Sequence, residues 1–292
     1  MSKNGKVRAH KLSKRKSFVP ALIITLLMVY GYYILAQFVF GGIISVPFVI
    51  FYDRETAETA TTAAVGLGGF IALFIYILWF RPEYQWKPRN TRLAFLLSVP
   101  LIIYELLLNV VFYAIAVGHF TFGLSKVTFM SVFFALQAGI CEEVAFREIG
   151  ISHLKRQVRD DKFNIPILLI LSVAFGATHL INILNMKAPF YYVFIQVFWT
   201  ILIGIFFGGV FMRTGNIWPC IITHALHDLF PVFFLDRFDL NDYPLFIYVV
   251  ITIGHMLLAT WGLYLVRKEK HPEIHKLWEE KWQIAEENGT MK

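Results

Sequence analysis

The chain has 292 residues, of which 57% are hydrophobic and only 16% are charged, and its mean hydropathy is +0.60. Soluble globular domains average about 45–50% apolar and about 25% charged residues. The composition therefore excludes a soluble globular enzyme, a disordered chain and a disulfide scaffold, and it indicates a membrane protein. The formal charge of +7 is placed unevenly along the sequence.

A basic arm at 1–17 opens the chain, with seven Lys and Arg residues and no acid. The apolar stretch that follows is too long for a signal peptide and lacks a small-residue cleavage site, so we expect an uncleaved first span. We interpret the arm as an orientation signal that also touches anionic lipid, and not as a nucleic-acid site.

Eight segments are apolar over about the 20 residues that a membrane-crossing helix needs. They lie at about 18–40, 63–80, 93–118, 127–153, 164–183, 189–212, 216–235 and 244–266. The apolar sequence directly after the first span, 41–52, is interpreted as either a tilted extension or an interfacial piece. Basic and base-poor loops alternate, and the positive-inside rule then predicts that both termini lie in the cytoplasm.

The fold class predicted from these spans is an all-α, polytopic membrane bundle of about eight transmembrane helices. No internal repeat or linker divides the sequence, so we predict one membrane domain at 18–266 between the arm and a cytoplasmic tail at 267–292. The tail contains Trp278 and Trp282 and is interpreted as a short amphipathic or solvated helix.

Small residues in the apolar segments are expected to serve packing. Gly204 and Gly208 form a GxxxG pattern, which is typical of closely packed membrane helices. Cys141 and Cys220 both lie in apolar stretches, so no disulfide framework is implied.

Ionisable residues at membrane depth are costly, and they often mark functional sites. The densest group contains Glu142, Glu143 and Arg147. Glu143 and Arg147 are i,i+4 neighbours that can pair on a helix, whereas Glu142 points about 100° away. Counting back from the loop places Glu142 roughly 18 Å deep. We therefore expect one carboxylate held ionised by Arg147 and the other tuned as a general base.

The alternative for this group is an ordinary ion pair at a helix end near the interface. That interpretation accounts well for Glu148 and His153, because the basic loop begins at Lys155. It accounts poorly for the two deeper glutamates.

Two further groups lie on later spans. His179 follows Phe175 by four residues, and a single histidine in an apolar helix is more often a hydrogen-bonded core residue than a catalytic one. His224 and Asp228 share a helix face, with His227 at its border. Their alternative role is a pair that fixes packing between spans.

The segment that carries His224 has two prolines, Pro219 and Pro231. They predict a distorted helix there.

If the three groups converge, the site holds a carboxylate, an imidazole and a second carboxylate–imidazole pair beside a water-filled approach. That inventory suits water activation and hydrolysis. The sequence contains no GxSxG, HExxH or Gly-rich phosphate motif. Cys141 and Ser131 are interpreted as packing residues. No motif indicates a role for Glu105, a further acid inside a predicted span.

The three groups together resemble a known family. Glu142-Glu143-x-x-x-Arg147, Phe175-x-x-x-His179 and His224-x-x-x-Asp228, in this order on successive membrane helices, resemble the CAAX prenyl endopeptidase type II and bacteriocin-processing (CPBP, or Abi) family of intramembrane proteases. The motif-bearing core covers about 127–232. The resemblance implies a multi-helix, all-α fold with an intramembrane glutamate protease-like core.

The resemblance also implies catalytic roles. Glu142 and His179 would activate the attacking water, and Glu143, positioned by Arg147, would orient or support the base. His224 and Asp228 would bind the developing oxyanion. The family often has Asn where this chain has Asp228, and an ionised Asp cannot donate to an oxyanion. Asp228 is therefore either protonated or a residue that orients His224, and His227 is not part of the motif.

The family is regarded as glutamate-dependent, so no metal or other cofactor is expected. The alternative is a zinc site made by Glu142, His179 and His224.

The predicted function is an intramembrane endopeptidase of a bacterial plasma membrane that cleaves a peptide or membrane-protein substrate, in peptide maturation, bacteriocin immunity or signalling. The partners expected are that substrate and the lipid bilayer, and no nucleic acid, with the oligomeric state left open. The alternatives are a proton-coupled transporter, and a non-catalytic membrane scaffold or immunity protein.

Overall fold

The computed structural model describes residues 17–51, 54–80, 86–120, 122–124, 127–184, 189–233 and 244–287. Over these ranges the chain folds into helices without strands, which confirms the prediction of an all-α bundle. The basic arm lies outside the described residues, apart from Ser17.

Five helical runs are long and apolar enough to cross a membrane, and they match five of the eight predicted spans. They are Thr91–Ala116, Phe129–Val158, Asp161–Ile183, Phe190–Thr214 and Leu245–Leu265. Three of these runs contain short π- or 3-10-helical segments. The elements are α4 (Thr91–Leu106), η3 (Leu107–Phe112), α5 (Tyr113–Val117), α6 (Phe129–Glu143), η4 (Val144–Ile151), α7 (Ser152–Val158), η5 (Asp161–Phe163), α8 (Asn164–Thr178), η6 (His179–Leu184), α9 (Phe190–Thr214) and α11 (Leu245–Leu265).

The N-terminal part forms a helical hairpin. Helix α1 (Phe18–Ile34) continues through the π segment η1 (Leu35–Phe40) into α2 (Gly41–Phe51), and α3 (Arg54–Phe80) runs back along α2. The apolar sequence at 41–52, for which two interpretations were open, is thus a continuation of the first helix up to Phe51. At Gly41 a Cβ would lie 2.8 Å from the Cα of Val65, so this glycine sets how closely α2 and α3 approach.

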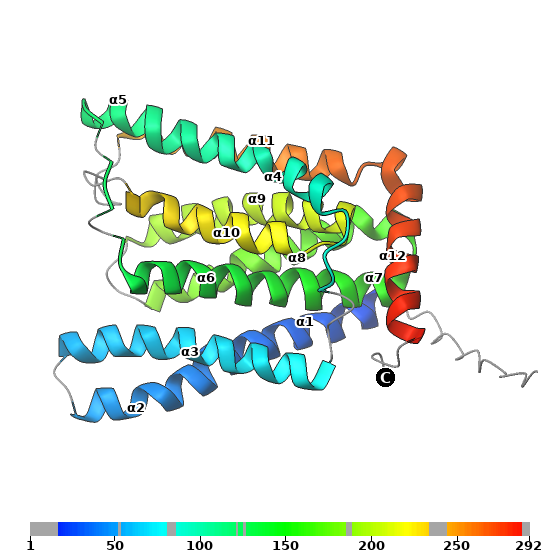
Figure 1. Ribbon diagram of the computed structural model, residues 1–292, viewed down its shortest axis with the longest axis horizontal. Coiled ribbons are helices and arrows are strands. Elements are labelled where there is room, and N and C mark those ends of the chain that lie inside the picture. The colour runs from blue at the N-terminus through cyan, green and yellow to red at the C-terminus, as the bar shows by residue number, and fades with distance from the viewer. Residues whose placement is uncertain are drawn as a thin grey trace, which may run out of the picture.

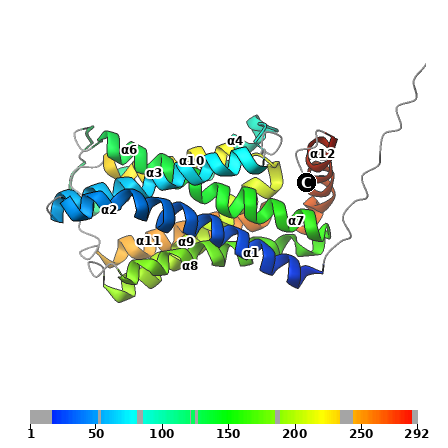
Figure 2. The same cartoon turned by 90° about the horizontal axis from the view of Figure 1, so that it is seen from below.

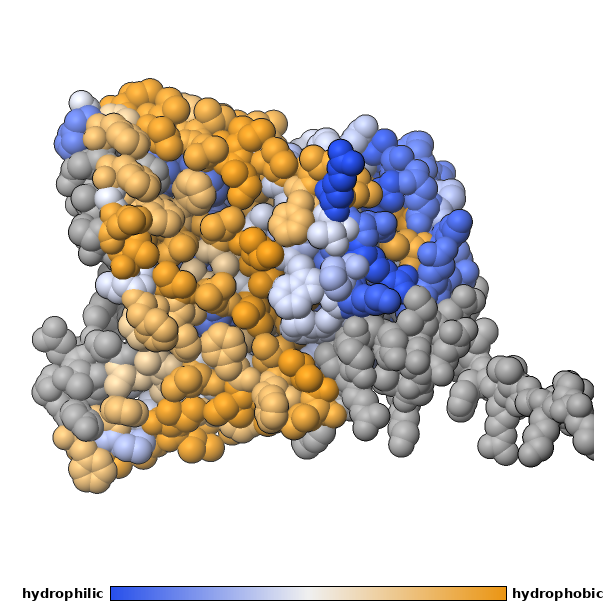
Figure 3. Space-filling view, viewed as in Figure 1, coloured by the Kyte–Doolittle hydropathy of each residue, from blue (hydrophilic) through white to orange (hydrophobic). Residues whose placement is uncertain are grey.

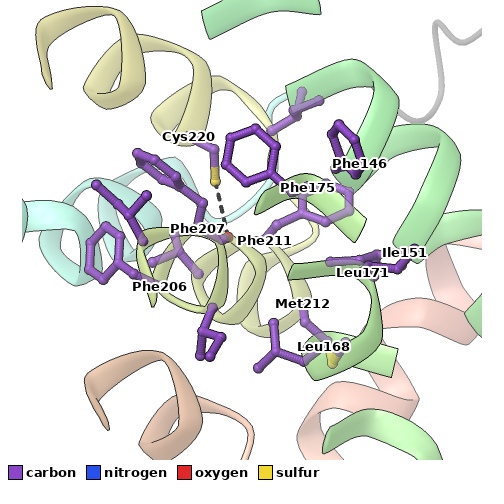
Figure 4. Close-up of a cluster of buried hydrophobic side chains, with 14 of the residues drawn as sticks. Phe146, Ile151, Leu168, Leu171, Phe175, Phe206, Phe207, Phe211, Met212 and Cys220 are labelled. Atoms are coloured by element: carbon purple, nitrogen blue, oxygen red, sulfur yellow. Dashed lines mark hydrogen bonds between the residues drawn. The ribbon is translucent and has the colours of Figure 1, made fainter. Parts of the chain in front are cut away.

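The helices are arranged in layers around α9. Figure 1 shows α1, α2 and α3 along one side of the bundle, α6 and α7 next to them, and α4, α5 and α11 along the other side. Figure 2 shows the same bundle from below, with α8, α9 and α11 on one face. Helix α9 packs against both α8 and α11, and its phenylalanines contribute to the buried cluster drawn in Figure 4. The core therefore lies along the motif-bearing helices.

Glycines allow the backbones of α9 and its neighbours to approach closely. A Cβ on Gly204 would meet Phe175 and Ser172 of α8, and one on Gly208 would lie 2.4 Å from Leu168. These contacts confirm that the GxxxG pattern serves helix packing.

The contact between α9 and α11 is closer still. A Cβ on Gly209 would lie 2.5 Å from the carbonyl oxygen of Gly262. Backbone therefore rests against backbone at this point, and no side chain fits between them.

The predicted span 216–235 differs from the structure. Its helix, α10 (Trp218–Leu229), has only 12 residues, and a 3-10 turn, η7 (Phe230–Phe233), follows it. A 12-residue helix is about 18 Å long, which is less than the roughly 30 Å of a bilayer core. Pro219 lies in the first turn, where proline is tolerated, and Pro231 lies in η7. Pro219 bounds the start of the helix, and the expected distortion lies at the other end, where the α-helix changes to a 3-10 turn at Pro231.

The tail forms helix α12 (His271–Glu287), which lies across one end of the bundle (Figure 1). Trp278 is fully buried and its indole N–H donates to the carbonyl oxygen of Met212 at 2.8 Å. Lys281 donates to the carbonyl of Gly215 at 3.2 Å and lies 3.6 Å from Glu148. Burial lowers the pKa of Lys281, and the charge of Glu148 opposes that shift. The tail is thus an amphipathic helix docked onto the bundle.

The surface divides along the long axis of the molecule. On the face seen in Figure 3, hydrophobic residues cover most of the described part and hydrophilic residues gather at the end where α12 lies. That division is expected of an integral membrane protein with one polar end.

Candidate active site

The motif on α6 and η4 builds a buried ion pair. Glu143 is fully buried, and its Oε2 lies 3.1 Å from Nε of Arg147 one turn later, which confirms the predicted i,i+4 pair. Arg147 also donates to the carbonyl oxygen of Gly204 at 3.3 Å. Its guanidinium lies 4.7 Å from the ring centre of Phe175 and 5.5 Å from that of Phe207, both on neighbouring helices. Arg147 therefore ties three helices together.

His224 of α10 completes this arrangement. Its Nδ1 donates to Oε1 of Glu143 at 2.8 Å, and its ring stacks on Phe207 with centroids 5.1 Å apart. These contacts fix the plane and the tautomer of the imidazole. Nε2 then lies 3.7 Å from both Glu142 Oε2 and Asp228 Oδ2. Nε2 is thus the ring nitrogen directed toward the two remaining carboxylates.

A cavity of about 480 Å³ lies in front of this nitrogen. Glu142, His179, His224 and Asp228 all line it, so the structure brings the three sequence groups together in one space. Its remaining walls are largely aromatic and polar, with Tyr104, Tyr113, Phe175, Tyr192, Gln196, Trp199 and Thr200 among them. A cavity with aromatic walls and a few converging polar groups has the form of a ligand site.

His179 enters this cavity from the junction of α8 and η6. Its Nδ1 lies 3.3 Å from the hydroxyl of Thr178, and its ring meets the edge of Phe175 at a centroid distance of 5.7 Å. Glu142 and His179 line the same cavity, yet no hydrogen bond or ion pair joins them in the described structure. A bound water between them would be required for joint action.

Sequence reasoning missed a second polar cluster on the same cavity. His227 Nδ1 lies 2.5 Å from Oε1 of Glu105, and the amide of Asn109 donates to the other oxygen of Glu105 at 2.8 Å. His255 lies beside them, with Nδ1 3.1 Å from the hydroxyl of Tyr104. The feature of the sequence that could have indicated this cluster was Glu105 itself, an isolated acid in an apolar span. Its histidine partner is 122 residues away and no spacing rule links them.

Two residues that were interpreted as part of an interfacial ion pair have other surroundings. Glu148 is only 1% exposed and pairs with Lys281 of α12, not with the basic loop. His153 Nδ1 lies 2.8 Å from the hydroxyl of Thr25 in α1. Cys141 and Cys220 are free and buried, as expected of packing residues.

Among the described residues, no group of three or more His, Cys, Asp or Glu side chains is arranged to hold a metal ion. The zinc site at Glu142, His179 and His224 stays an alternative prediction.

Comparison with known families identifies the core. Residues 124–230 match the family model described as type II CAAX prenyl endopeptidase Rce1-like. This segment is therefore similar to the type II CAAX prenyl endopeptidases, which supports the resemblance to the CPBP family that the motifs indicate. The matched range contains Glu142, Glu143, Arg147, His179, His224 and Asp228. The Rce1-like domain belongs to a protease family and lies in an integral membrane bundle.

Comparisons with curated proteins and with solved structures found no match. The family assignment therefore rests on the Rce1-like match and on the motif residues within it.

Proposed function

We propose that the protein is an intramembrane endopeptidase that hydrolyses a peptide bond of a membrane-associated peptide or protein. One observation carries the proposal. Within the Rce1-like core, Glu142 and two imidazoles, those of His179 and His224, line a single cavity and leave room between them. Ionisable residues at membrane depth that face such a cavity are typical of functional sites.

In the proposed reaction a water lies between Glu142 and His179. Glu142 takes a proton from this water as it attacks the scissile carbonyl, and His179 holds the water in line. General base catalysis of this kind contributes about 10²–10⁴-fold to a rate. Glu142 is suited to the task because it is not consumed by a direct pair with Arg147, which binds Glu143 instead.

The oxyanion that forms is proposed to bind at Nε2 of His224. Glu143 holds the opposite nitrogen and Phe207 fixes the ring plane, so the Nε2–H of protonated His224 is set in place before the substrate arrives. Such preorganised donors are among the largest contributors to catalysis. Because Glu143 already orients His224, Asp228 is not needed for that task. We propose that Asp228 serves as a second donor when protonated and otherwise attracts the charge of the imidazolium.

The cellular setting is proposed from the sequence. The alternation of basic loops favours both termini in the cytoplasm of a bacterial plasma membrane. A peptide or membrane-protein substrate then fits roles in peptide maturation, bacteriocin immunity or signalling. No metal is assigned to the reaction.

The proposal is tested by peptide cleavage. Protein purified in detergent would be incubated with a library of quenched fluorescent peptides, and products would be identified by mass spectrometry. Glu142→Gln and His179→Gln should each lower cleavage about 10²-fold or more. Glu269→Gln, at an exposed carboxylate outside the cavity, is the matched control and should cleave like the parent protein.

Two results would overturn the proposal. One is an absence of cleavage by the parent protein across the library and in liposomes. The other is cleavage that persists in both Glu142→Gln and His179→Gln. A proton flux that Glu142→Gln abolishes, without any proteolysis, would support a transporter instead.

A further inference from the structure

The cavity contains a second carboxylate–imidazole pair that no catalytic role above uses. His227 lies almost one turn after His224 on α10, and its Nδ1 donates to Oε1 of Glu105 on α4 at 2.5 Å. The other oxygen of Glu105 accepts from the side-chain amide of Asn109 at 2.8 Å. Both Glu105 and His227 line the cavity that holds Glu142 and His179.

Exposure shows which partner faces the cavity. The side chain of Glu105 is 2% exposed, whereas that of His227 is 26% exposed. Because Nδ1 is bound to Glu105, Nε2 is the nitrogen of His227 that remains to meet a ligand. The carboxylate therefore lies behind the imidazole and holds it toward the open space.

Each of the two α10 histidines is paired with a carboxylate, and the two carboxylates differ in the other group that they bind. Glu143 shares its charge with Arg147 at 3.1 Å. Glu105 has only the neutral amide of Asn109, and in the described structure no Lys or Arg forms an ion pair with it. The cation that matches Glu105 is thus His227 itself when it carries a proton. With its proton the pair has no net charge, and once the proton has left, the amide of Asn109 and the Nδ1–H of the neutral imidazole still donate to the carboxylate.

Peptide hydrolysis needs a group of this kind. Amines leave as neutral molecules, so the nitrogen must gain a proton as the C–N bond breaks. In the function proposed above, Glu142 and His179 act on the water and His224 binds the oxyanion. Of these, Glu142 comes to carry a proton, the one that it takes from water, and His227 offers a second proton on the same cavity.

We propose that His227, positioned by Glu105, is the general acid that protonates the leaving amine. This inference rests on the proposed endopeptidase function and adds a residue to it. The tetrahedral intermediate collapses, the electron pair of the C–N bond moves to nitrogen, and Nε2 of His227 gives that nitrogen its proton. The carboxylic acid product then returns a proton to the neutral imidazole. Glu142 passes the proton that it took from water to solvent, and the resting state is restored.

His255 is the natural comparison within the same wall. Its ring centre is 6.1 Å from that of His227, and its Nδ1 contacts the hydroxyl of Tyr104 and the carbonyl oxygen of Ile251. No carboxylate stands behind this ring in the described structure, and its side chain is buried. It shares the surroundings of His227 without the arrangement of a proton donor.

The test uses two substrates with different leaving groups to distinguish proton donation by His227 from a purely structural role of this residue. Two substrates share the acyl segment of a peptide cleaved by the parent protein. One is the peptide amide, and the other is an aryl ester whose phenolate leaves without a proton at neutral pH. Both would be measured for parent protein, His227→Gln, Glu105→Gln and the control His255→Gln in detergent, with folding checked by gel filtration.

His227→Gln should lower amide turnover about 10²-fold or more. The factor by which it lowers ester turnover should be at least ten times smaller than this. Glu105→Gln, which keeps the size and an acceptor oxygen, should show the same imbalance to a smaller degree, and it keeps the proposal testable if His227→Gln does not fold. His255→Gln should affect both substrates equally.

Equal losses on amide and ester in both the His227→Gln and Glu105→Gln proteins would overturn the proposal, because they indicate structural support alone. Undiminished amide turnover in His227→Gln would overturn it as well. Failure of the parent protein to cleave either substrate would instead overturn the endopeptidase function, and this inference with it.

Discussion

Nδ1 of His224 and Oε1 of Glu143 are 2.8 Å apart, although the two residues are 81 positions apart in the chain. The same carboxylate also binds Arg147 at 3.1 Å. The second glutamate of the motif therefore orients the imidazole of a different helix, while the first glutamate faces the cavity. Adjacent residues on α6 are thus given two separate tasks.

Substitution of Glu143 should act on catalysis and not on substrate binding. Glu143→Gln keeps the size of the side chain but removes the charge that holds His224 and Arg147. We expect kcat for the cleaved peptide to fall about 10²-fold, because the donor at Nε2 is no longer fixed, with KM nearly unchanged. A rise in KM alone, with kcat retained, would show that Glu143 does not act through His224.

Loss of Arg147 should destabilise the fold. Its side chain is 2% exposed and it contacts Glu143 and Gly204. Arg147→Met leaves Glu143 buried without its cation, and breaking such a pair costs about 3–5 kcal/mol. Unfolding in a denaturing detergent series measures the loss. The double change Arg147→Met with Glu143→Gln should lose less than the sum of the single changes, and strict additivity would contradict this coupling.

Lys281 should anchor α12 to the motif helix. Lys281→Met leaves the buried Glu148 without its partner and should lower the free energy of unfolding by about 3 kcal/mol. Lys276→Met on the exposed face of the same helix is the matched control and should change it little. The fluorescence of Trp278, which is buried in the contact, reports on docking. Equal effects of the two substitutions would rule out the anchor.

The contact between α9 and α11 should tolerate no side chain. Gly209→Ala places a Cβ 2.5 Å from the carbonyl oxygen of Gly262, and overpacking of this kind costs about 1–3 kcal/mol. Gly31→Ala in α1 has no atom within 4 Å of the new Cβ, so stability should be unchanged or higher by up to about 1 kcal/mol. Thermal unfolding in detergent compares the two. A Gly209→Ala protein as stable as Gly31→Ala would contradict the packing described.

Removal of metal should leave the reaction intact. Protein treated with a strong chelator and then dialysed is expected to cleave its peptide at the untreated rate, because no proposed step uses a metal. The measurement is the initial rate before and after treatment, with the bound metal determined by elemental analysis. Activity that disappears and returns on addition of zinc would replace the metal-free mechanism with one at Glu142, His179 and His224.

Hydropathy predicts most of the fold because each apolar span is a local property of the chain. The same reasoning predicts the pairing of Glu143 with Arg147, which depends only on helix periodicity. The length of α10 is harder to predict from the sequence. The apolar sequence that follows Leu229 resembles membrane sequence, yet the α-helix ends there and a 3-10 turn follows.

The second cluster was beyond sequence reasoning for a different reason. Glu105 and His227 lie on separate helices, and neither belongs to a motif. Only the packing of α4 against α10 brings them together. The same holds for Glu148 and Lys281, whose pairing depends on how α12 docks. Charges that look unrelated in a sequence become partners through tertiary contacts that local patterns do not encode.

The position of α12 has a practical consequence for handling the protein. Tyr113, Tyr192 and Pro231 of the cavity wall belong to the ends of helices that lie opposite α12 in Figure 1. A reporter or affinity tag joined to the C-terminal side therefore attaches at the far pole of the bundle from these residues. Immobilisation through that pole would present the cavity end outward to an added peptide.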